Sequence, residues 1–480
     1  MNKLLAFWNS KSQGAKSAIV FTLALLVSRG LSFITMPIFT RIMPADQIGI
    51  VGLYTSSFAI LSSITSLGLT SGGFMVGMKD YGSRREQYIS SILSLTTLCS
   101  IFFSVLFIVY PTLWTNLLGI PKGLIYLMLI GCLVTPAYEF WLMRQRYEYA
   151  YKKAALLTVL ISLISTLLAV AAVLLSKDRT SNTGEVRIYV SVGSSLLVYL
   201  VLWLVQLKRG GVLYNKEYWT TSLALGLPLL GHAFASQILS VSDRILIGKF
   251  VNNTAVGIYT TLYSVGSLSL IFWSAINSSF VPYLFQNIES QKEKSSVSKI
   301  SVQLLSMFAA ITIGISLLAP EVVRLLAPSE YYEHVSIIPP IVAGVFFIAV
   351  GNLYSNILVY CKKTLAIMFS SIIACIFSII LNIVLIPKLG FEVAAYNTLL
   401  SYVIFACLQA ICSYRLFKRQ YEGEFVYDNV KIFIVIITTV LLCLICIPLY
   451  NYKILRYLIA GVVLLLLGFQ YVKRINTKTV

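Results

Sequence analysis

Long, uninterrupted apolar runs of about twenty residues recur along nearly the whole chain. Each is long enough to cross the hydrocarbon core of a bilayer as a helix. Apolar residues make up 58% of the 480 residues and charged residues 11%, against about 45–50% and about 25% in a soluble domain. Membrane β-strands would instead alternate apolar and polar residues over short segments. These features exclude a soluble enzyme, a disordered chain and a fibrous protein, and predict an all-α polytopic membrane protein.

We expect about fourteen transmembrane helices. The first run, 18–39, is too long for a signal-peptide core, and no small-residue cleavage site follows it, so we expect it to remain as a helix. The predicted spans are 18–39, 48–72, 88–110, 123–142, 154–175, 188–207, 221–248, 256–284, 299–319, 333–358, 364–386, 392–414, 430–449 and 455–472.

The basic residues predict the orientation of these spans. The net charge is +19, from 37 Lys and Arg against 18 Asp and Glu. The N-terminus and every second connector hold 25 of the 37 basic residues, whereas the opposite connectors and helix ends hold 11. Cytoplasmic loops of membrane proteins collect Lys and Arg. We therefore expect both termini in the cytoplasm, and this bias leaves no reason to predict a nucleic-acid partner.

No feature of the chain predicts catalysis. The connectors are short, the longest being about sixteen residues (415–430), so none of them holds a catalytic domain. Walker, H-E-x-x-H and G-x-S-x-G motifs are absent from the sequence. The eight cysteines show neither a disulfide framework nor the spacing of a zinc site. We expect a transporter rather than an enzyme, with no cofactor and no metal.

The two halves of the chain resemble each other at an offset of about 208 residues. The segment from Arg41 to Gly49 aligns with the segment from Lys249 to Gly257, and three further matches follow in the same order. Six spans separate equivalent positions, which predicts parallel repeats with a substrate site between them near the middle of the membrane. We expect six-helix lobes at 1–210 and 211–420, followed by two additional helices at 421–480.

Several cations lie in or at the ends of the spans. Arg29 lies about twelve residues into the first span, where an arginine costs roughly 2.5–3.5 kcal/mol on insertion scales. It is either an anion-binding group facing a water-filled cavity or a side chain that snorkels or caps a carbonyl. Arg41 and Lys249 occupy equivalent positions of the repeat, as cavity cations or interfacial anchors. Asp243 and Arg244 need not pair, since adjacent helix residues do not face each other, and one of them is free to face the cavity.

Two titratable side chains are candidates for ion coupling. Glu139 lies in span four, where the alternatives are a proton-coupling carboxylate and a structural ion pair with Arg144 or Arg146. His232 lies in span seven, where the alternatives are a coupling role and an ordinary structural hydrogen bond. Spans two and eight are rich in Ser, Thr and Gly, and Asn277 belongs to the second of these. They predict either close helix packing or the wall of a hydrophilic cavity with helices that bend.

The stretch from Pro37 to Gly49, PIFTRIMPADQIG, resembles the first-span signature of the Wzx polysaccharide flippases. Their superfamily also holds multidrug exporters and peptidoglycan-precursor flippases. The stretch from Asp243 to Gly248, the following Val256-Gly257-Ile258-Tyr259 and the later Pro282 resemble the seventh and eighth spans of that family. The stretch from Pro387 to Tyr396 resembles its eleventh-to-twelfth connector.

This resemblance implies two six-helix lobes around a central cavity in the bacterial inner membrane. It implies a cargo of undecaprenyl-diphosphate-linked oligosaccharide, as used for O-antigen of lipopolysaccharide or exopolysaccharide, moved outward by alternating access. By the same analogy Arg29 and Arg244 match positions of cavity cations. The partners implied are the lipid-linked cargo, the bilayer, a polysaccharide polymerase and a chain-length regulator. The alternatives are a cation- or proton-coupled drug exporter of the same superfamily and a membrane polysaccharide polymerase.

Overall fold

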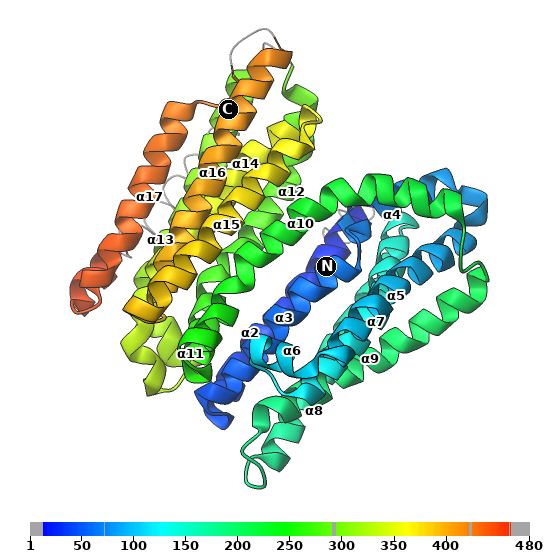
Figure 1. The fold of residues 1–480 in the computed structure, drawn as a ribbon. Helices are drawn as coiled ribbons and strands as arrows, with labels where there is room; N and C mark the ends of the chain where they lie inside the picture. The colour runs from blue at the N-terminus through cyan, green and yellow to red at the C-terminus, as the bar shows by residue number, and fades with distance from the viewer. Residues whose placement is uncertain (1–12, 72, 290–293, 422–424, 460, 462–480) are drawn as a thin grey trace, which may run out of the picture. The chain divides into compact units, whose positions relative to one another are not determined.

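The computed structural model describes residues 13–71, 73–289, 294–421, 425–459 and 461 (Figure 1). Within these ranges the chain forms helices and turns and no β-strand. Twelve helical segments are long and apolar enough to cross a membrane, and each corresponds to one predicted span. The predicted seventh span, 221–248, lies within α10, Lys216–Phe250, a helix of 35 residues that is not among these twelve. The fourteenth, 455–472, lies mostly outside the described residues. The prediction of an all-α polytopic membrane protein is confirmed.

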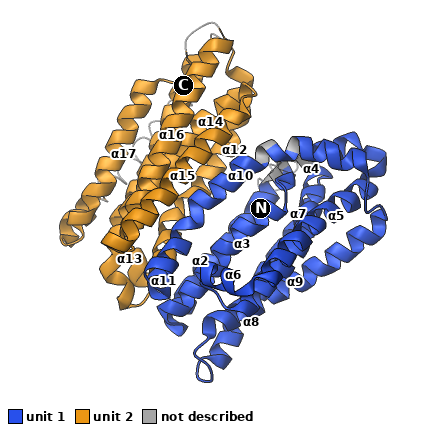
Figure 2. Ribbon diagram, viewed as in Figure 1, with its two compact units in different colours: residues 1–257 blue, residues 258–480 orange. Residues whose placement is uncertain are grey.

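The chain divides into two compact units, residues 1–257 and 258–480 (Figure 2). Unit 1 contains α2 to α10 and the first residues of α11. Besides α10, its helices are α2 (Gln13–Ile42), α3 (Ala45–Thr65), η1 (Leu69–Ser71), α4 (Gly73–Asp80), η2 (Gly82–Arg84), α5 (Arg85–Val109), α6 (Pro111–Leu118), α7 (Lys122–Tyr147), α8 (Tyr151–Ser176) and α9 (Thr183–Gly210).

Unit 2 contains the rest of α11 (Asn253–Ser267) and the helices that follow it. These are α12 (Ser269–Asn287), α13 (Lys294–Leu326), η3 (Ser329–Ile337), α14 (Ile338–Tyr360), α15 (Thr364–Leu389), α16 (Val393–Gln420) and α17 (Asn429–Leu449). The centre of the unit is α14, which packs against α12, α13, α15, α16 and α17. Its position explains why almost all of its side chains are buried.

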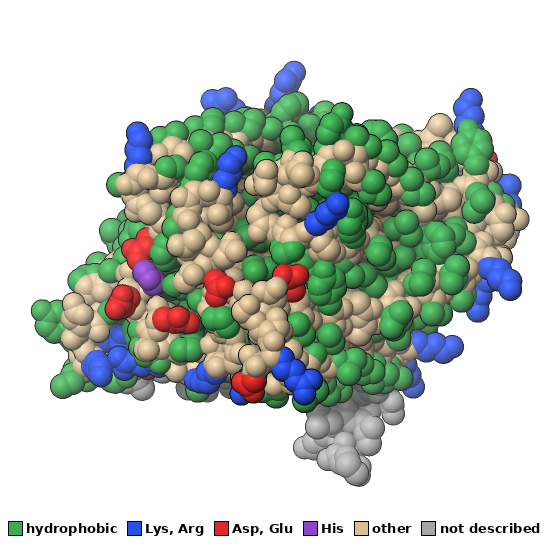
Figure 3. All heavy atoms as spheres, turned by 60° about the horizontal axis from the view of Figure 1, so that its bottom comes forward, with side chains coloured by type: hydrophobic (Ala, Val, Ile, Leu, Met, Phe, Trp, Pro, Cys, Tyr) green, Lys and Arg blue, Asp and Glu red, His purple; other side chains and the backbone are tan. Residues whose placement is uncertain are grey.

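The surface of the molecule is largely apolar, as expected of a chain surrounded by lipid. Leu167 of α8 and Ile376 of α15 are 59% and 52% exposed. On the face drawn in Figure 3, apolar side chains cover much of the area, and many of the Lys and Arg side chains lie along its margins. A protein with so many exposed leucines and isoleucines would aggregate in water, whereas acyl chains of a bilayer cover these side chains favourably.

The predicted second and eighth spans are both interrupted. Span two ends as α3 at Thr65, and the chain then turns through Leu67 and Gly68, with φ of 53° and 66°. Span eight is split at Leu268 into α11 and α12. Both breaks fall within the Ser- and Gly-rich runs for which bending helices were one of the two alternatives. At Gly68 a side chain is excluded twice, by its positive φ and by the Gly226 carbonyl oxygen, 2.8 Å from the position of a Cβ.

Two segments that are equivalent in the sequence repeat contact each other within unit 1, at the start of α3 and at the start of α11. A Cβ placed on Gly49 would lie 1.9 Å from the carbonyl oxygen of Asn253, and a Cβ placed on Gly257 would lie 1.9 Å from the carbonyl oxygen of Ala45. Ala45 and Asn253 are themselves equivalent at the offset of 208 residues. The first turns of α3 and α11 therefore make a reciprocal contact, as expected at a two-fold axis, and small residues allow this approach.

Candidate functional site

Arg29 lies on the exposed side of α2 in unit 1. The helix buries Phe21, Ala24 and Thr35 and packs mainly against α8. Arg29 is exposed, and no hydrogen bond or ion pair of its guanidinium is found among the described residues. The alternative in which Arg29 caps a carbonyl therefore has no support in unit 1. The side chain instead presents an uncompensated positive charge outside the packed interior of the unit.

A ladder of hydroxyl groups crosses unit 1 beside Arg29. The Ser162 hydroxyl of α8 donates to the Ser28 hydroxyl of α2 over 3.0 Å. One turn earlier on α8, the Thr158 hydroxyl lies 2.8 Å from the hydroxyl of Tyr138 on α7. The ladder therefore joins α2, α8 and α7 within a single helical turn.

The ladder places Arg29 and Glu139 at similar depth, because each directly follows one of its members. A second contact agrees, since the Arg146 guanidinium lies 5.1 Å from the ring centroid of Phe21. Arg29 lies eight residues after Phe21 along α2, and Glu139 lies seven residues before Arg146 along α7. At 1.5 Å per residue these distances are about 12 and about 10 Å.

The structural ion pair considered for Glu139 is not formed. Arg144 instead pairs with Glu86 at 2.7 Å and with Glu148 at 3.0 Å, and Arg146 packs on an aromatic ring. Across the described ranges Glu139 has no ion pair or hydrogen bond, although it is only partly exposed. A carboxylate in a membrane helix without a cation beside it has a strong tendency to bind a proton or a metal cation. Glu139 therefore keeps its coupling role as a hypothesis.

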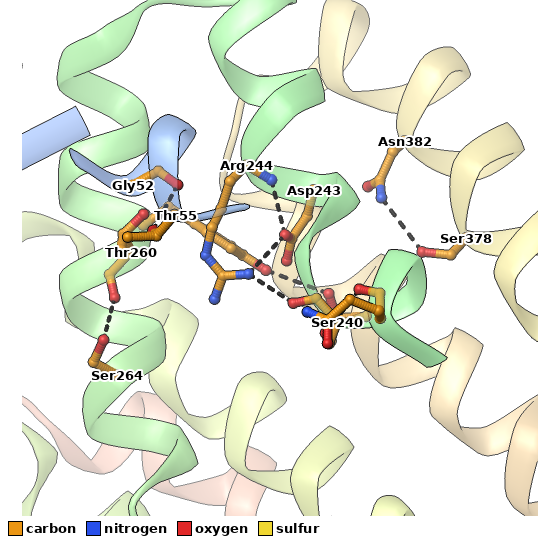
Figure 4. Close-up of polar contacts among 12 residues, drawn as sticks. Gly52, Thr55, Ser240, Asp243, Arg244, Thr260, Ser264, Ser378 and Asn382 are labelled. Carbon is orange, nitrogen blue, oxygen red and sulfur yellow. Dashed lines mark hydrogen bonds and ion pairs between the residues drawn. The ribbon is translucent and has the colours of Figure 1, made fainter. Parts of the chain in front are cut away.

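Asp243 and Arg244 of α10 do pair, contrary to the argument from their adjacency. The Arg244 Nη1 lies 3.2 Å from the Asp243 Oδ1 and donates to the Ser240 carbonyl oxygen at 2.6 Å (Figure 4). The backbone N–H of Arg244 also donates to Asp243 Oδ1 at 2.8 Å. The long guanidinium folds back along the helix, which is how neighbours in sequence come into contact. Both residues are buried, at 2% and 7% exposure, and together they bring no net charge to the membrane.

The other candidate residues lie apart from this pair. Arg41 is exposed at the end of α2, where it donates to the Pro37 carbonyl oxygen at 2.9 Å. Lys249 is exposed at the end of α10, with its Nζ 5.9 Å from the Phe250 ring centroid. Both positions are compatible with interfacial anchors.

Asn277 and His232 each have a hydrogen-bonding partner nearby. In unit 2, Asn277 accepts a 2.8 Å hydrogen bond from the side chain of Asn356 on α14. In unit 1, His232 Nδ1 lies 3.3 Å from the hydroxyl of Ser236, one turn further along α10. The contact of His232 agrees with the structural alternative stated for it.

The sequence did not single out Arg187, a cation near the start of α9. Its guanidinium lies 3.7 Å from the ring centroid of Phe39 at the far end of α2. Its place near the start of a span resembled that of any interfacial arginine, and nothing in the spacing linked it to a ring about 150 positions away. Within the described part of the chain, no group of His, Cys, Asp and Glu side chains forms a metal site.

Comparison with known proteins identifies the family. The model of the family described as polysaccharide biosynthesis protein matches residues 15–288, more than half of the chain. The chain belongs to this family. One relative, the probable low-salt glycan biosynthesis flippase Agl15 of Haloferax volcanii, is 24% identical over 447 residues, 85% of each protein.

Solved structures of a flippase and of a multidrug transporter share the fold of this chain. The lipid II flippase MurJ in an inward closed conformation matches with a TM-score of 0.65 and 15% identity, covering 95% of this chain and 99% of that one. An inward-facing multidrug resistance MATE family transporter of the MOP superfamily matches with a TM-score of 0.59 and 14% identity, covering 85% and 100%. The chain thus has the fold of these transporters, and it is a multi-pass membrane protein of the polysaccharide biosynthesis family.

Proposed function

We propose that this protein flips undecaprenyl-diphosphate-linked oligosaccharide repeat units from the cytoplasmic to the outer leaflet of a bacterial inner membrane. In this proposal both termini are cytoplasmic, and lobes 1–210 and 211–420 alternate access to the cargo, while 421–480 adds two further spans. The observation that carries the proposal is Arg29, an uncompensated cation about halfway along the first span of a polysaccharide biosynthesis protein. The named relative Agl15, a probable glycan flippase, supports the same class of cargo.

The chemistry of the cargo fits such a cation. A diphosphate brings negative charge into a medium where an unpaired charge is costly. The planar guanidinium binds two phosphate oxygens at once, which a lysine does not. An inside-negative potential drives each exported negative charge outward by about 2.3 kcal/mol per 100 mV. Outward movement of the anionic cargo therefore needs no exported counter-ion, and collapse of the potential at constant pH is expected to slow flipping in vesicles.

A second candidate function is export of cationic small molecules. The similarity to a multidrug transporter and the carboxylate of Glu139, for which the described chain provides no ion pair, favour it. An exporter of that kind needs an acidic group in the membrane to bind protons or cationic drugs. The polymerase alternative has no such observation behind it, and a polymerase and a chain-length regulator remain proposed partners.

Deletion in the native host distinguishes these functions. The two readouts are the amount of surface polysaccharide and the leaflet in which undecaprenyl-linked repeat units accumulate. The flippase proposal expects loss of surface polymer with single repeat units on the cytoplasmic leaflet. Normal surface polymer with increased drug sensitivity would support the exporter. Repeat units that reach the outer leaflet unpolymerised would contradict the flippase and indicate a polymerase.

A further inference from the structure

An apolar groove runs along the side of unit 2, between α16 and α17. Helix α14 packs against both of these helices, whereas no extensive packing joins α16 to α17 in the described part of the unit. Helix α14 therefore forms the floor of the groove, with α16 and α17 as its two walls. The cavity measures about 510 Å³, within the range of about 300–1,000 Å³ for pockets that bind small molecules.

The side chains of the groove change in character along its length. Phe347 and Val350 of the floor and Ala406, Cys407 and Ala410 of the α16 wall are apolar or nearly so. Arg415 lies at the other end, close to where α16 finishes. Nine residues separate Ala406 from Arg415, a length of about 13 Å along the helix. Most of the groove is thus apolar, with a cation at one end.

Arg415 is available to an external anion. Its side chain is exposed, and it makes no ion pair or hydrogen bond with any described residue. Lys418 and Arg419, within one turn of it, are also exposed and add to the positive potential. Among the described residues, the acidic group at the adjoining start of α17, Asp428, is already paired with Lys431 at 2.7 Å. The charge at this end of the groove is therefore complementary to a phosphate, and basic clusters at a membrane face attract anionic lipids.

We propose that this groove binds one anionic phospholipid, with an acyl chain along α14 and its phosphate at Arg415. The apolar part of the groove matches the acyl chain of such a lipid, and Arg415 at its end matches the phosphate. The site belongs to α14, α16 and α17, and none of the residues assigned to cargo binding lines it. The proposal therefore stands whether or not the flippase proposal is correct.

The test uses the full-length protein in nanodiscs made from equal parts of phosphatidylglycerol and phosphatidylcholine. After transfer to a mild detergent, native mass spectrometry measures which lipid remains bound. The wild type is expected to retain one phosphatidylglycerol. Arg415→Gln removes the cation and Ala410→Phe fills the apolar part of the groove. Each variant is expected to lower the occupancy of phosphatidylglycerol about fivefold or more. A single sharp size-exclusion peak shows that a variant has folded, and Arg415→Gln alone decides if Ala410→Phe does not fold.

Matched controls lie on the same helix. Lys418→Gln removes a neighbouring charge that does not line the groove, and Leu400→Phe enlarges an exposed side chain outside it. Both are expected to keep the phosphatidylglycerol.

Four results would overturn the proposal. The first is equal retention in Arg415→Gln and the wild type, and the second is equal retention of phosphatidylcholine. The third is a clear gain of lipid when residues 462–480 are removed, which would assign the groove to that segment of the chain itself. A polyprenyl lipid retained from the host in place of phospholipid would likewise reject it and assign the groove to the cargo tail.

Discussion

Two arginines of unit 1 are held in opposite electrostatic conditions. Arg244 is buried and paired with Asp243 at 3.2 Å, so removing either partner would leave the other charge buried without this ion pair. Arg29 is exposed and has no acidic partner in the part of the chain that the structure describes. Arg244 is thus suited to holding α10 together, whereas Arg29 is suited to binding an anion that arrives and leaves.

We expect Arg29→Ala to reduce flipping about tenfold or more, because a charge-assisted hydrogen bond to phosphate contributes about 1.5–3 kcal/mol. Arg29→Lys keeps the charge but loses the two-oxygen geometry and should retain intermediate activity. Restoration of surface polymer in the deletion strain, normalised to protein level, measures this. Arg179→Ala, in an exposed loop, is the matched control. Full activity of Arg29→Ala would show that the first span does not bind the headgroup.

Glu139 makes a separate prediction about ion coupling. Glu139→Gln keeps the size and hydrogen-bonding capacity of the side chain but removes its ability to bind a proton. If Glu139 couples transport to protons, the variant should lose the response of transport to a pH gradient while keeping its response to membrane potential. Transport in proteoliposomes under each gradient in turn measures this. Glu86→Gln, whose carboxylate lies 2.7 Å from Arg144, is the control, and an unchanged pH response in Glu139→Gln would make Glu139 structural.

Among the helices, α17 begins with a pH-sensitive cap. The Asp428 side chain accepts from the Lys431 backbone N–H at 3.1 Å and pairs with the Lys431 ammonium. The hydrogen bond from the Lys431 side chain is the main cause that lowers the pKa of Asp428. Since the folded pKa lies below the unfolded value of about 3.9, the cap stabilises α17 above that pH and is lost as pH falls through the folded pKa.

We therefore expect amide exchange in the first turn of α17, corrected for intrinsic rates, to accelerate below about pH 4. Asp428→Asn keeps a good capping side chain but does not titrate, so its first turn should exchange at a rate that depends less on pH. Hydrogen–deuterium exchange with mass spectrometry measures both. The same pH dependence in the two proteins would place its origin in another group.

The helices show where sequence reasoning succeeds and where it stops. Hydropathy located the spans because a membrane helix is apolar over its whole length, so each residue adds to the signal. The breaks at Gly68 and Leu268 were expected only as bending, because their exact positions depend on packing, such as that of Gly68 on Gly226. Ion pairs were the weakest predictions. One partner of Arg144 is Glu86, nearly sixty positions away, and only the packing of α5 against α7 brings these two residues together.

Over the molecule as a whole, the repeat leads to a prediction about its two equivalent glycines. Gly49→Ala and Gly257→Ala each place a Cβ 1.9 Å from a backbone carbonyl oxygen of the other first turn. Backbone atoms in a helix cannot move aside as a flexible side chain can, so the free energy of unfolding of each variant should fall by about 1–3 kcal/mol or more. Thermal unfolding in detergent should show lower, similar midpoints for both.

Gly193→Ala provides the control for that comparison. The position lies inside α9 with no atom within 4 Å of an added Cβ, so alanine should be neutral or stabilise by up to about 1 kcal/mol. A normal midpoint for either Gly49→Ala or Gly257→Ala would contradict the reciprocal contact.

The reciprocal contact also bears on how such a chain arises. In a dimer of two identical six-span chains, one glycine would occupy both sides of the contact, and a single mutation would damage the interface twice. Joining the two copies into one chain removes that constraint, because each side then changes by itself. Ala45 and Asn253 already differ, while Gly49 and Gly257 are the same. Gene fusion thus frees the residues that contribute only a backbone carbonyl to the contact to diverge, but not the glycines that leave space for it.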